Sequence, residues 1–356
     1  MQQPSNPSEK SIDPRVVVKD SGIKALAALL CANARYVPQL RPLKALANCL
    51  KRNTPLLCEG MRGGGKTALA EAVGEACNLP VYYLQCMHGL TVHDILFEWD
   101  RAAQSQFVQQ QISAGTSISA ARAAQWDMEF LNLGEVLEAF DAASKAMYPP
   151  VLIIDEIDKL DARSEDTLLQ VLARGYAQVP RLKPDSRVGI KPVRGRPGRN
   201  YPIVILTSNN QREGVSSPLR SRCRCTFIKP PTLAEEVMIL HTRVPAASRE
   251  LLAQVCKLMK ALRGMGSIVE KPGLRESIEF LDTLVADGIM SIDASVIDDN
   301  IDVLAKYPTD ADNIDTGIQR LIQVIHLAHT DIDGWIDNAF RINEASRARR
   351  PNLLAR

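Results

Sequence analysis

The chain has 356 residues, of which 46% are hydrophobic and 24% charged, and its formal net charge is +2 at pH 7. These are the proportions of an ordinary globular protein, and so small a charge does not by itself indicate a nucleic-acid partner. No apolar run is long enough to span a bilayer, and the N-terminal MQQPSNPSEKSIDP is polar where a secretory signal would be apolar. We therefore expect a cytoplasmic protein without a membrane partner, long enough for two domains.

Residues 1–14 are predicted to form a flexible tail and residues 15–231 an α/β domain. Within that domain, short uninterrupted Val, Ile and Leu runs alternate with amphipathic stretches. The runs are PLLCEG, VYYLQC, PPVLIIDEI, PIVILTSN and CTFIKPP. Strands that are apolar throughout and separated by helices predict a doubly wound parallel sheet that is covered on both faces.

The first apolar run leads into a glycine-rich loop that fits the phosphate-binding pattern G-x-x-x-x-G-K-[ST]. The loop and the first residue after it are Gly60, Met61, Arg62, Gly63, Gly64, Gly65, Lys66, Thr67 and Ala68. Backbone N–H groups and the positive end of the following helix would bind phosphates, while Lys66 would neutralise the β- and γ-phosphates and Thr67 would offer a hydroxyl to Mg²⁺. A glycine-rich turn that binds nothing is the alternative for this motif taken alone.

A second motif, VLIIDE at 151–156, is a predicted buried strand that ends in two carboxylates. In open α/β sheets, ligands bind beyond the carboxyl ends of the strands. Asp155 is therefore predicted to bind Mg²⁺, and Glu156 to orient and deprotonate the attacking water. Capping of the next helix is the other interpretation of Asp155. Two phosphate-site motifs in this order, at the ends of two predicted parallel strands, predict a P-loop nucleoside triphosphate hydrolase.

Residues 232–356 are predicted to form a smaller all-α domain. It opens on a capping box, in which Thr232 and Glu235 satisfy each other's backbone N–H groups. The apolar periodicity predicts helices at the following approximate positions: 233–243, 249–263, 273–287, 294–306, 313–329 and 332–346.

With these motifs the chain resembles the AAA+ ATPases, and within them the MoxR-type branch, from about Tyr36 to about residue 350. PIVILTSNN places Asn209 where such enzymes hold a polar residue between the γ-phosphate and the lytic water. SPLRSRCR matches the segment that ends in an arginine finger, with Arg222 at the finger position and Arg220 as a neighbouring candidate. PGLR matches the start of a lid helix from which Arg275 would contact the nucleotide. An ordinary basic surface patch and an exposed helix arginine are the alternatives.

The resemblance implies an AAA+ core with an all-α lid, ATP and Mg²⁺ as cofactors, and self-association into a homohexameric ring. A guanidinium can stabilise the charge of the transferring phosphoryl group, and a finger that acts on the next subunit requires a head-to-tail contact. MoxR-like proteins remodel protein clients in maturation or metal insertion, commonly with a von Willebrand factor A domain protein. That domain is not in this sequence, so such a partner would be another chain.

Two segments depart from a minimal core. Inserts are predicted near 100–131 and at 176–200, and Arg62 stands where many relatives have proline. The second insert carries seven Lys or Arg and one Asp, so nucleic acid is a possible ligand of 181–199, while a solvated hairpin is the other interpretation. Two further functions therefore stay open: a nucleic-acid-associated AAA+ motor or defence-system ATPase, and a nucleotide-gated scaffold with negligible turnover.

Overall fold

The computed structural model describes residues 11–61, 63–183, 185–190, 201–209 and 214–348. The chain divides into two compact units, which we treat separately. Apart from residues 35–37 and 63–64, which group with the second unit, the described part of the first unit extends to Ile228 and the second begins at Lys229. Within the described ranges, none of the helices is both long and apolar enough to cross a membrane.

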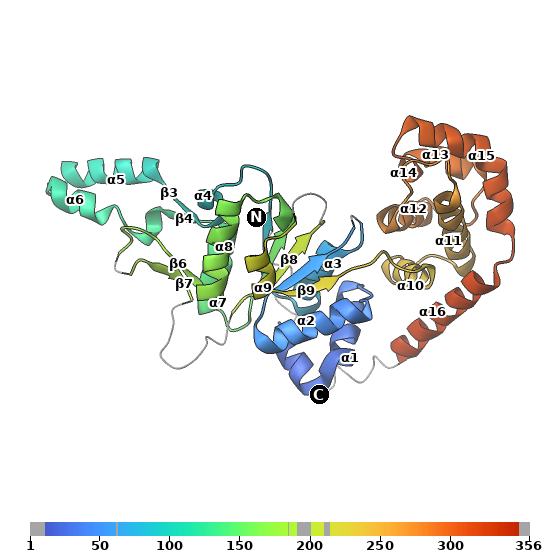
Figure 1. The fold of residues 1–356 in the computed structure, drawn as a ribbon, viewed down its shortest axis with the longest axis horizontal. Helices are drawn as coiled ribbons and strands as arrows, with labels where there is room; N and C mark the ends of the chain where they lie inside the picture. Colours follow the sequence, from blue (N-terminus) through green and yellow to red (C-terminus); the bar gives the residue numbers. More distant parts are fainter. Residues whose placement is uncertain (1–10, 62, 184, 191–200, 210–213, 349–356) are drawn as a thin grey trace. The chain divides into compact units, whose positions relative to one another are not determined.

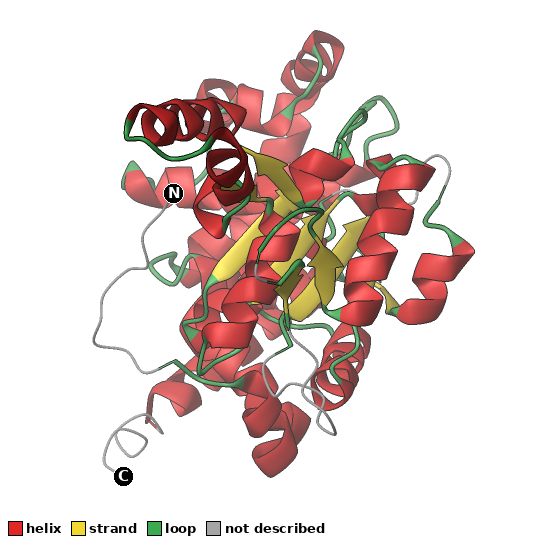
Figure 2. Ribbon diagram, turned by 90° about the vertical axis from the view of Figure 1, so that its left-hand side faces the viewer, coloured by secondary structure: helices red, strands yellow, loops and turns green. Residues whose placement is uncertain are grey.

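A five-stranded parallel sheet lies at the centre of the first unit (Figure 2), in the order β2-β5-β8-β1-β9. Its strands are β1 (Leu56–Glu59), β2 (Val81–Gln85), β5 (Val151–Asp155), β8 (Ile203–Ser208) and β9 (Arg224–Phe227). Every residue of β1, β5 and β8 is buried, which explains why their sequences are apolar runs and not alternating patterns. The predicted doubly wound parallel sheet is confirmed.

Besides two helices of the first predicted insert, given below, the described part of the first unit contains seven helices. They are α1 (Pro14–Ala34), α2 (Leu40–Arg52), α3 (Lys66–Cys77), α4 (Val92–Ile95), α7 (Glu135–Lys145), α8 (Ala162–Arg174) and α9 (Ser217–Arg222), with 3-10 turns η1 (Met128–Phe130) and η2 (Ile157–Lys159). Fully buried Leu137 and Phe140 on α7 belong to the same apolar core as Leu152 and Ile154 on β5. Because α3 begins at Lys66, directly after the glycine-rich loop, its unpaired N-terminal N–H groups lie at that loop.

A small antiparallel pair of strands bounds the first predicted insert, and another lies within the second. In the first, β3 (Phe97–Trp99) pairs with β4 (Leu131–Leu133), and the chain between them forms α5 (Arg101–Ser113) and α6 (Ile118–Ala124). Figure 1 shows α5 and α6 beyond these strands, at the far end of this unit. In the second, β6 (Tyr176–Gln178) pairs with β7 (Arg187–Gly189), while residues 184 and 191–200 lie outside the described ranges.

All described elements of the second unit are helices, and they have a core of their own around Leu252, Phe280 and Leu284. They are α10 (Leu233–Arg243), α11 (Arg249–Gly264), α12 (Leu274–Ala286), α13 (Ala294–Asp299), α14 (Ile301–Leu304), α15 (Pro308–His326) and α16 (Thr330–Ala348). The predicted capping box at Thr232 and Glu235 is present.

Two of the predicted helices in this unit differ from the structure. The helix expected at 294–306 is divided at Asn300, whose φ of −118° and ψ of 24° are not helical and whose side chain donates to the carbonyl of Val296 at 2.9 Å. The helix expected at 313–329 runs from Pro308 to His326. A proline is tolerated in the first turn because its missing N–H would have no helical partner there.

Candidate active site

The predicted phosphate loop connects β1 to α3 and depends on its glycines. Gly63 and Gly65 have φ angles of 71° and 85°, a region that side chains with a β-carbon rarely adopt. A β-carbon at Gly60 would collide with the carbonyl oxygen of Ile228. Met61 is exposed, and Arg62 lies outside the described residues. The glycines thus give the chain the tight path that lets successive N–H groups face one ligand.

Lys66 is buried at the first position of α3, with 6% of its surface exposed. Its ammonium donates to the carbonyls of Gly60 at 3.0 Å and Met61 at 2.7 Å. Burial lowers the pKa of Lys66, and the nearby carboxylate of Asp155 opposes that shift. The positive charge is therefore held inside the loop, where a phosphate oxygen would be a stronger acceptor than a carbonyl.

Asp155, the last residue of β5, joins three elements through its carboxylate. Oδ1 accepts from the hydroxyl of Thr67 at 2.9 Å and also from the hydroxyl of Thr207, while Oδ2 accepts from the hydroxyl of Tyr83 at 2.6 Å. Burial, followed by the bond to Asp155, raises the pKa of Tyr83, so its hydroxyl stays a donor at neutral pH. Thr67 and Asp155 together present hydroxyl and carboxylate oxygens, the donor set that suits Mg²⁺.

Glu156 has an unusual backbone and a fully engaged carboxylate. Its φ of 54° and ψ of 47° are left-handed, which is uncommon outside glycine and is often found at functional sites. Oε1 accepts from the amide of Asn209 at 2.9 Å, and Oε2 accepts from the amide of Gln85 at 2.9 Å and pairs with Lys159. The backbone N–H of Glu156 donates to Thr207 at 3.1 Å. The structure thus brings the side chain of Asn209 to Glu156, while their joint action on a water stays a prediction.

Four residues whose side chains contact Asp155 or Glu156 were not predicted: Tyr83, Gln85, Lys159 and Thr207. Gln85 ends β2 and lies opposite Asp155 in the strand register. The rule that selected Asp155, a polar residue at the carboxyl end of an apolar strand, would also have selected Gln85 and Thr207. Tyr83 gave no such signal, because an aromatic residue within a strand is more often a packing residue.

The structure separates the two finger candidates on α9. Arg220 makes a bidentate pair with Glu59, with Nη1 donating to Oε2 at 2.9 Å and Nη2 donating to Oε1. Glu59 is fully buried and directly precedes the phosphate loop, so Arg220 fixes α9 to the end of β1. Arg222 is exposed, and its Nη1 donates to the carbonyl of Pro218 at 3.2 Å. Arg220 is thus bound within its own chain, whereas Arg222 faces outward.

Arg275 is exposed at the second position of α12, in the helical unit. The turn before it is held by Arg263, which donates to the carbonyls of Pro272 at 2.7 Å and Gly273 at 3.2 Å. Arg263 also pairs with buried Glu236 at 2.5 and 2.8 Å. The start of α12 is thereby fixed within its unit, while nucleotide contact by Arg275 stays a prediction.

In the described part of the basic segment 181–199, Arg181 and Arg187 have local partners, while Lys183 is exposed. The Arg181 guanidinium lies over the Trp126 ring, 4.7 Å from its centroid, and Arg187 pairs with Asp185 at 3.2 Å. The remaining basic residues of the segment, at 191–199, lie outside the described residues.

Comparison with known proteins identifies the domain that carries this site. Residues 55–223 match the family model of the AAA domain (dynein-related subfamily). The curated proteins contain no match to the chain. The matched residues include the phosphate loop, the strand-end carboxylates, Asn209 and Arg222.

Three structures of RuvB from Thermotoga maritima are also similar in part. One single-residue variant is 16% identical with a TM-score of 0.39, over 73% of this chain and 67% of that chain. RuvB described as a Holliday junction branch migration motor is 15% identical with a TM-score of 0.39, over 74% and 66%. A second variant is 15% identical with a TM-score of 0.38, over 74% and 66%. Likeness at this level says nothing about activity. It is the domain match, over a segment with the complete phosphate loop and the strand-end carboxylates, that identifies residues 55–223 as the AAA domain of an ATPase.

Proposed function

We propose that this ATPase is a Mg²⁺-dependent, MoxR-like remodeller that acts as a ring, in which ATP hydrolysis changes the conformation of a bound client protein. One observation supports the ring most directly. The groups for phosphate binding and water activation are assembled in one chain, whereas Arg222 is exposed and donates to a carbonyl of its own helix. An arginine so placed is suited to a neighbour's nucleotide.

In this proposal, each residue around the phosphates has its own role in hydrolysis. Loop N–H groups and Lys66 hold the β- and γ-phosphates. Thr67 and Asp155 would bind Mg²⁺, which neutralises phosphate charge when bound. Glu156 takes a proton from the attacking water, and Asn209, bonded to the same carboxylate at 2.9 Å, orients that water.

Arg222 then completes the site of the next subunit. Its helix is tied by Arg220 to Glu59, one residue before the phosphate loop. A change at the loop would therefore move the finger that serves the neighbour. Such a heterologous contact closes into a ring or continues as a filament, and we propose a hexamer. The client would be a protein, with a von Willebrand factor A domain protein as a candidate partner.

The trans arrangement is tested by mixing two inactive variants. Lys66→Ala removes the phosphate-binding charge and Arg222→Ala removes the finger, so a mixed ring contains some interfaces in which both groups are intact. We expect the mixture to recover ATPase activity that neither variant has alone. Arg224→Ala, which removes an exposed arginine two positions away, is the matched control and should stay active. No recovery at any mixing ratio would show that the finger does not act in trans.

Client remodelling is tested separately with Glu156→Gln, which should bind ATP without hydrolysing it. Client proteins should accumulate on this variant in ATP and should be absent from Lys66→Ala treated in the same way. If Glu156→Gln leaves turnover unchanged, the chain is a nucleotide-gated scaffold and the remodeller proposal is wrong. If turnover falls but no protein accumulates, hydrolysis stands and client remodelling is contradicted.

A further inference from the structure

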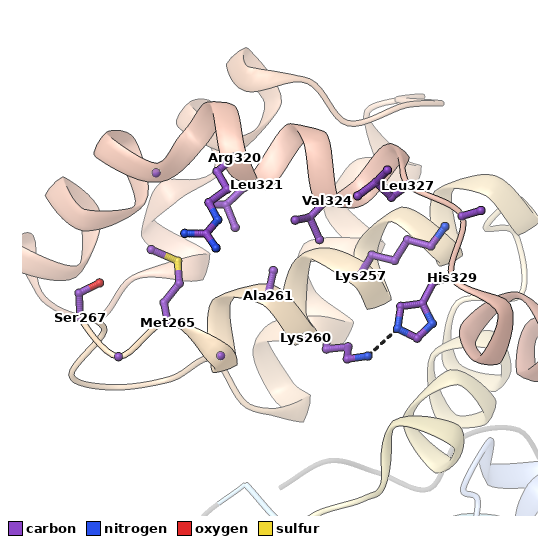
Figure 3. A pocket seen from close by; sticks show the side chains of 14 residues that line it. Lys257, Lys260, Ala261, Met265, Ser267, Arg320, Leu321, Val324, Leu327 and His329 are labelled. Carbon is purple, nitrogen blue, oxygen red and sulfur yellow. Dashed lines mark hydrogen bonds between the residues drawn. The ribbon is translucent and has the colours of Figure 1, made fainter.

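The helical unit contains a hollow of about 720 Å³ between α11 and α15 (Figure 3). Each helix lines it with a single face, because the residues recur at the helical spacing i, i+3, i+4, i+7. These residues are Lys257, Lys260, Ala261 and Gly264 on α11, and Gly317, Arg320, Leu321 and Val324 on α15. The turn at 265–267 and the loop at 327–329 line the rest. We call this hollow the basic groove.

Small residues keep the basic groove open. A β-carbon built on Gly264 or Gly266 would meet nothing within 4 Å, so free space lies above both. Between the helices, the apolar side chains of Ala261, Leu321 and Val324 line the groove. Leu327 at its edge leaves 63% of its surface exposed. Apolar surface of this kind, bordered by charged groups, is typical of a protein-binding site.

The charged groups of the groove are all of one sign. Among its lining residues, all of which are described, Lys257, Lys260, Arg320 and His329 are basic and none is acidic. Lys257 has a partner in Asp333 at 3.3 Å. Lys260 Nζ donates to His329 Nε2 at 2.5 Å, and the other two N–H groups of this ammonium can donate to a carboxylate. Figure 3 shows Arg320 well separated from the Lys260–His329 pair. The groove therefore suits an apolar ligand with several separated negative groups better than one small anion.

We propose that the basic groove binds an acidic, amphipathic helix of a partner protein. The seven-residue spacing on each wall corresponds to roughly 10 Å, about two helical turns of ligand. Leucine-like side chains of that helix would cover Ala261, Leu321 and Val324, while its carboxylates would pair with Arg320 and Lys260. This is the helix-in-groove mode of recognition, with charge selecting the partner. The inference requires neither a ring nor ATP turnover, so it stands or falls independently of the proposed function.

A designed peptide tests the chemistry on the full chain. The probe is a fluorescein-labelled helix of about 14 residues with blocked ends, with leucines at i, i+3, i+4 and i+7 and glutamates at the other exposed positions. Fluorescence anisotropy should show saturable binding that weakens as salt rises. Replacing every Glu by Gln, or every Leu by Ser, should weaken binding at least about tenfold. No saturable binding at low salt, or equal binding by either replaced peptide, would overturn the proposal.

Variants of the chain test the location. The pair Lys260→Glu with Arg320→Glu reverses two charges, and Gly264→Leu fills the groove without changing charge. Each should weaken the glutamate–leucine peptide at least about tenfold. Because Arg320 is exposed, Arg320→Glu alone serves if the double variant folds poorly. Arg341→Glu, which changes an exposed arginine on α16 outside the groove, is the charge-matched control and should bind normally.

Two results would reject the site even if the probe binds. Unchanged binding by Gly264→Leu would place the peptide elsewhere. Complete displacement of the peptide by low-millimolar inorganic phosphate or by a single-stranded oligonucleotide, with no dependence on its leucines, would show a general anion site. Loss of binding in both groove variants, with normal binding by Arg341→Glu, supports the proposal.

Discussion

Two carboxylate sites of this protein, one in each unit, are held in different ways. In the helical unit, Glu236 is 1% exposed and accepts from both terminal nitrogens of Arg263 and from Ser277 at 2.6 Å. In the α/β unit, Asp155 and Glu156 accept mainly from neutral hydroxyls and amides, with Lys159 as the paired cation. Glu236 is thus fixed by a permanent charge, whereas Asp155 and Glu156 are held mainly by neutral donors.

Because of this difference, we expect substitutions at the Glu236 site to change stability and substitutions at Asp155 and Glu156 to change activity. Removing a charged partner from a buried carboxylate leaves an uncompensated charge, so the free energy of unfolding should fall. A carboxylate held by neutral donors at the carboxyl end of a strand can be altered with less effect on folding, but its chemistry is lost. The left-handed backbone of Glu156 is a second sign that this position serves activity, since such strain persists where the surroundings impose it.

The largest effect is expected for Glu156→Gln. The amide cannot accept a proton from water, so kcat should fall by about 10²–10⁴-fold. ATP affinity and the melting temperature should change little, because the side chain keeps its shape. Steady-state ATPase assays with equilibrium nucleotide binding measure both quantities. Glu98→Gln, at an exposed carboxylate of the same unit, should behave as the parent. A large loss of stability in Glu156→Gln would contradict the expectation that a carboxylate held by neutral donors contributes little to folding.

Arg263→Ala should show the opposite pattern. It removes the charged partner of Glu236 and two bonds to the turn before α12, so the free energy of unfolding should fall by about 3 kcal/mol. Chemical denaturation followed by circular dichroism measures this loss. The control is Lys145→Ala, which breaks the surface pair of Lys145 with Asp141 at 2.5 Å and should cost no more than about 1 kcal/mol. Equal losses in the two variants would contradict the role given to burial.

Glu59→Gln tests whether the loss of stability depends on the partner of the carboxylate or on the unit in which the carboxylate lies. Glu59 lies in the α/β unit, yet it is fully buried and paired with an arginine, as Glu236 is. We therefore expect a loss of about 2 kcal/mol in unfolding free energy. Adding Arg220→Met should restore part of it, because both charges are then removed. If the unfolding free energy of Glu59→Gln equals that of the parent, pairing with an arginine does not by itself decide how much a buried carboxylate contributes to stability.

The smallest effect concerns the protonation of Lys66. Burial lowers its pKa, so its charge is lost at a lower pH than that of an ordinary lysine. Bound phosphate favours the ammonium and raises that pKa. Nucleotide affinity should therefore fall as pH rises through the lowered pKa, and binding there should take up a fraction of a proton. Calorimetry in two buffers of different ionisation enthalpy measures the uptake, which Lys66→Met should abolish. Proton release on binding would contradict the assigned direction.

Much of the fold and the core of the site could be predicted from the sequence, because both depend on residues that are close together in the chain. The phosphate loop is built from consecutive residues, so its glycines and Lys66 can be recognised as a motif. Strands buried on both faces must be apolar throughout, so β1, β5 and β8 could also be recognised, and Asp155 was found because it ends one of them. These features depend on neighbours in the chain, which periodicity and motif spacing describe.

Only the tertiary structure decided which distant side chains meet. Tyr83 reaches Asp155 across 72 positions, Gln85 reaches Glu156 across 71, and Arg220 reaches Glu59 across 161. The division at Asn300 and the basic groove between α11 and α15 likewise depend on how helices end and pack. The physical reason is the same in each case. The apolar periodicity of a segment specifies which of its faces is buried, whereas strand order and helix packing specify which side chains contact a charged group on that face.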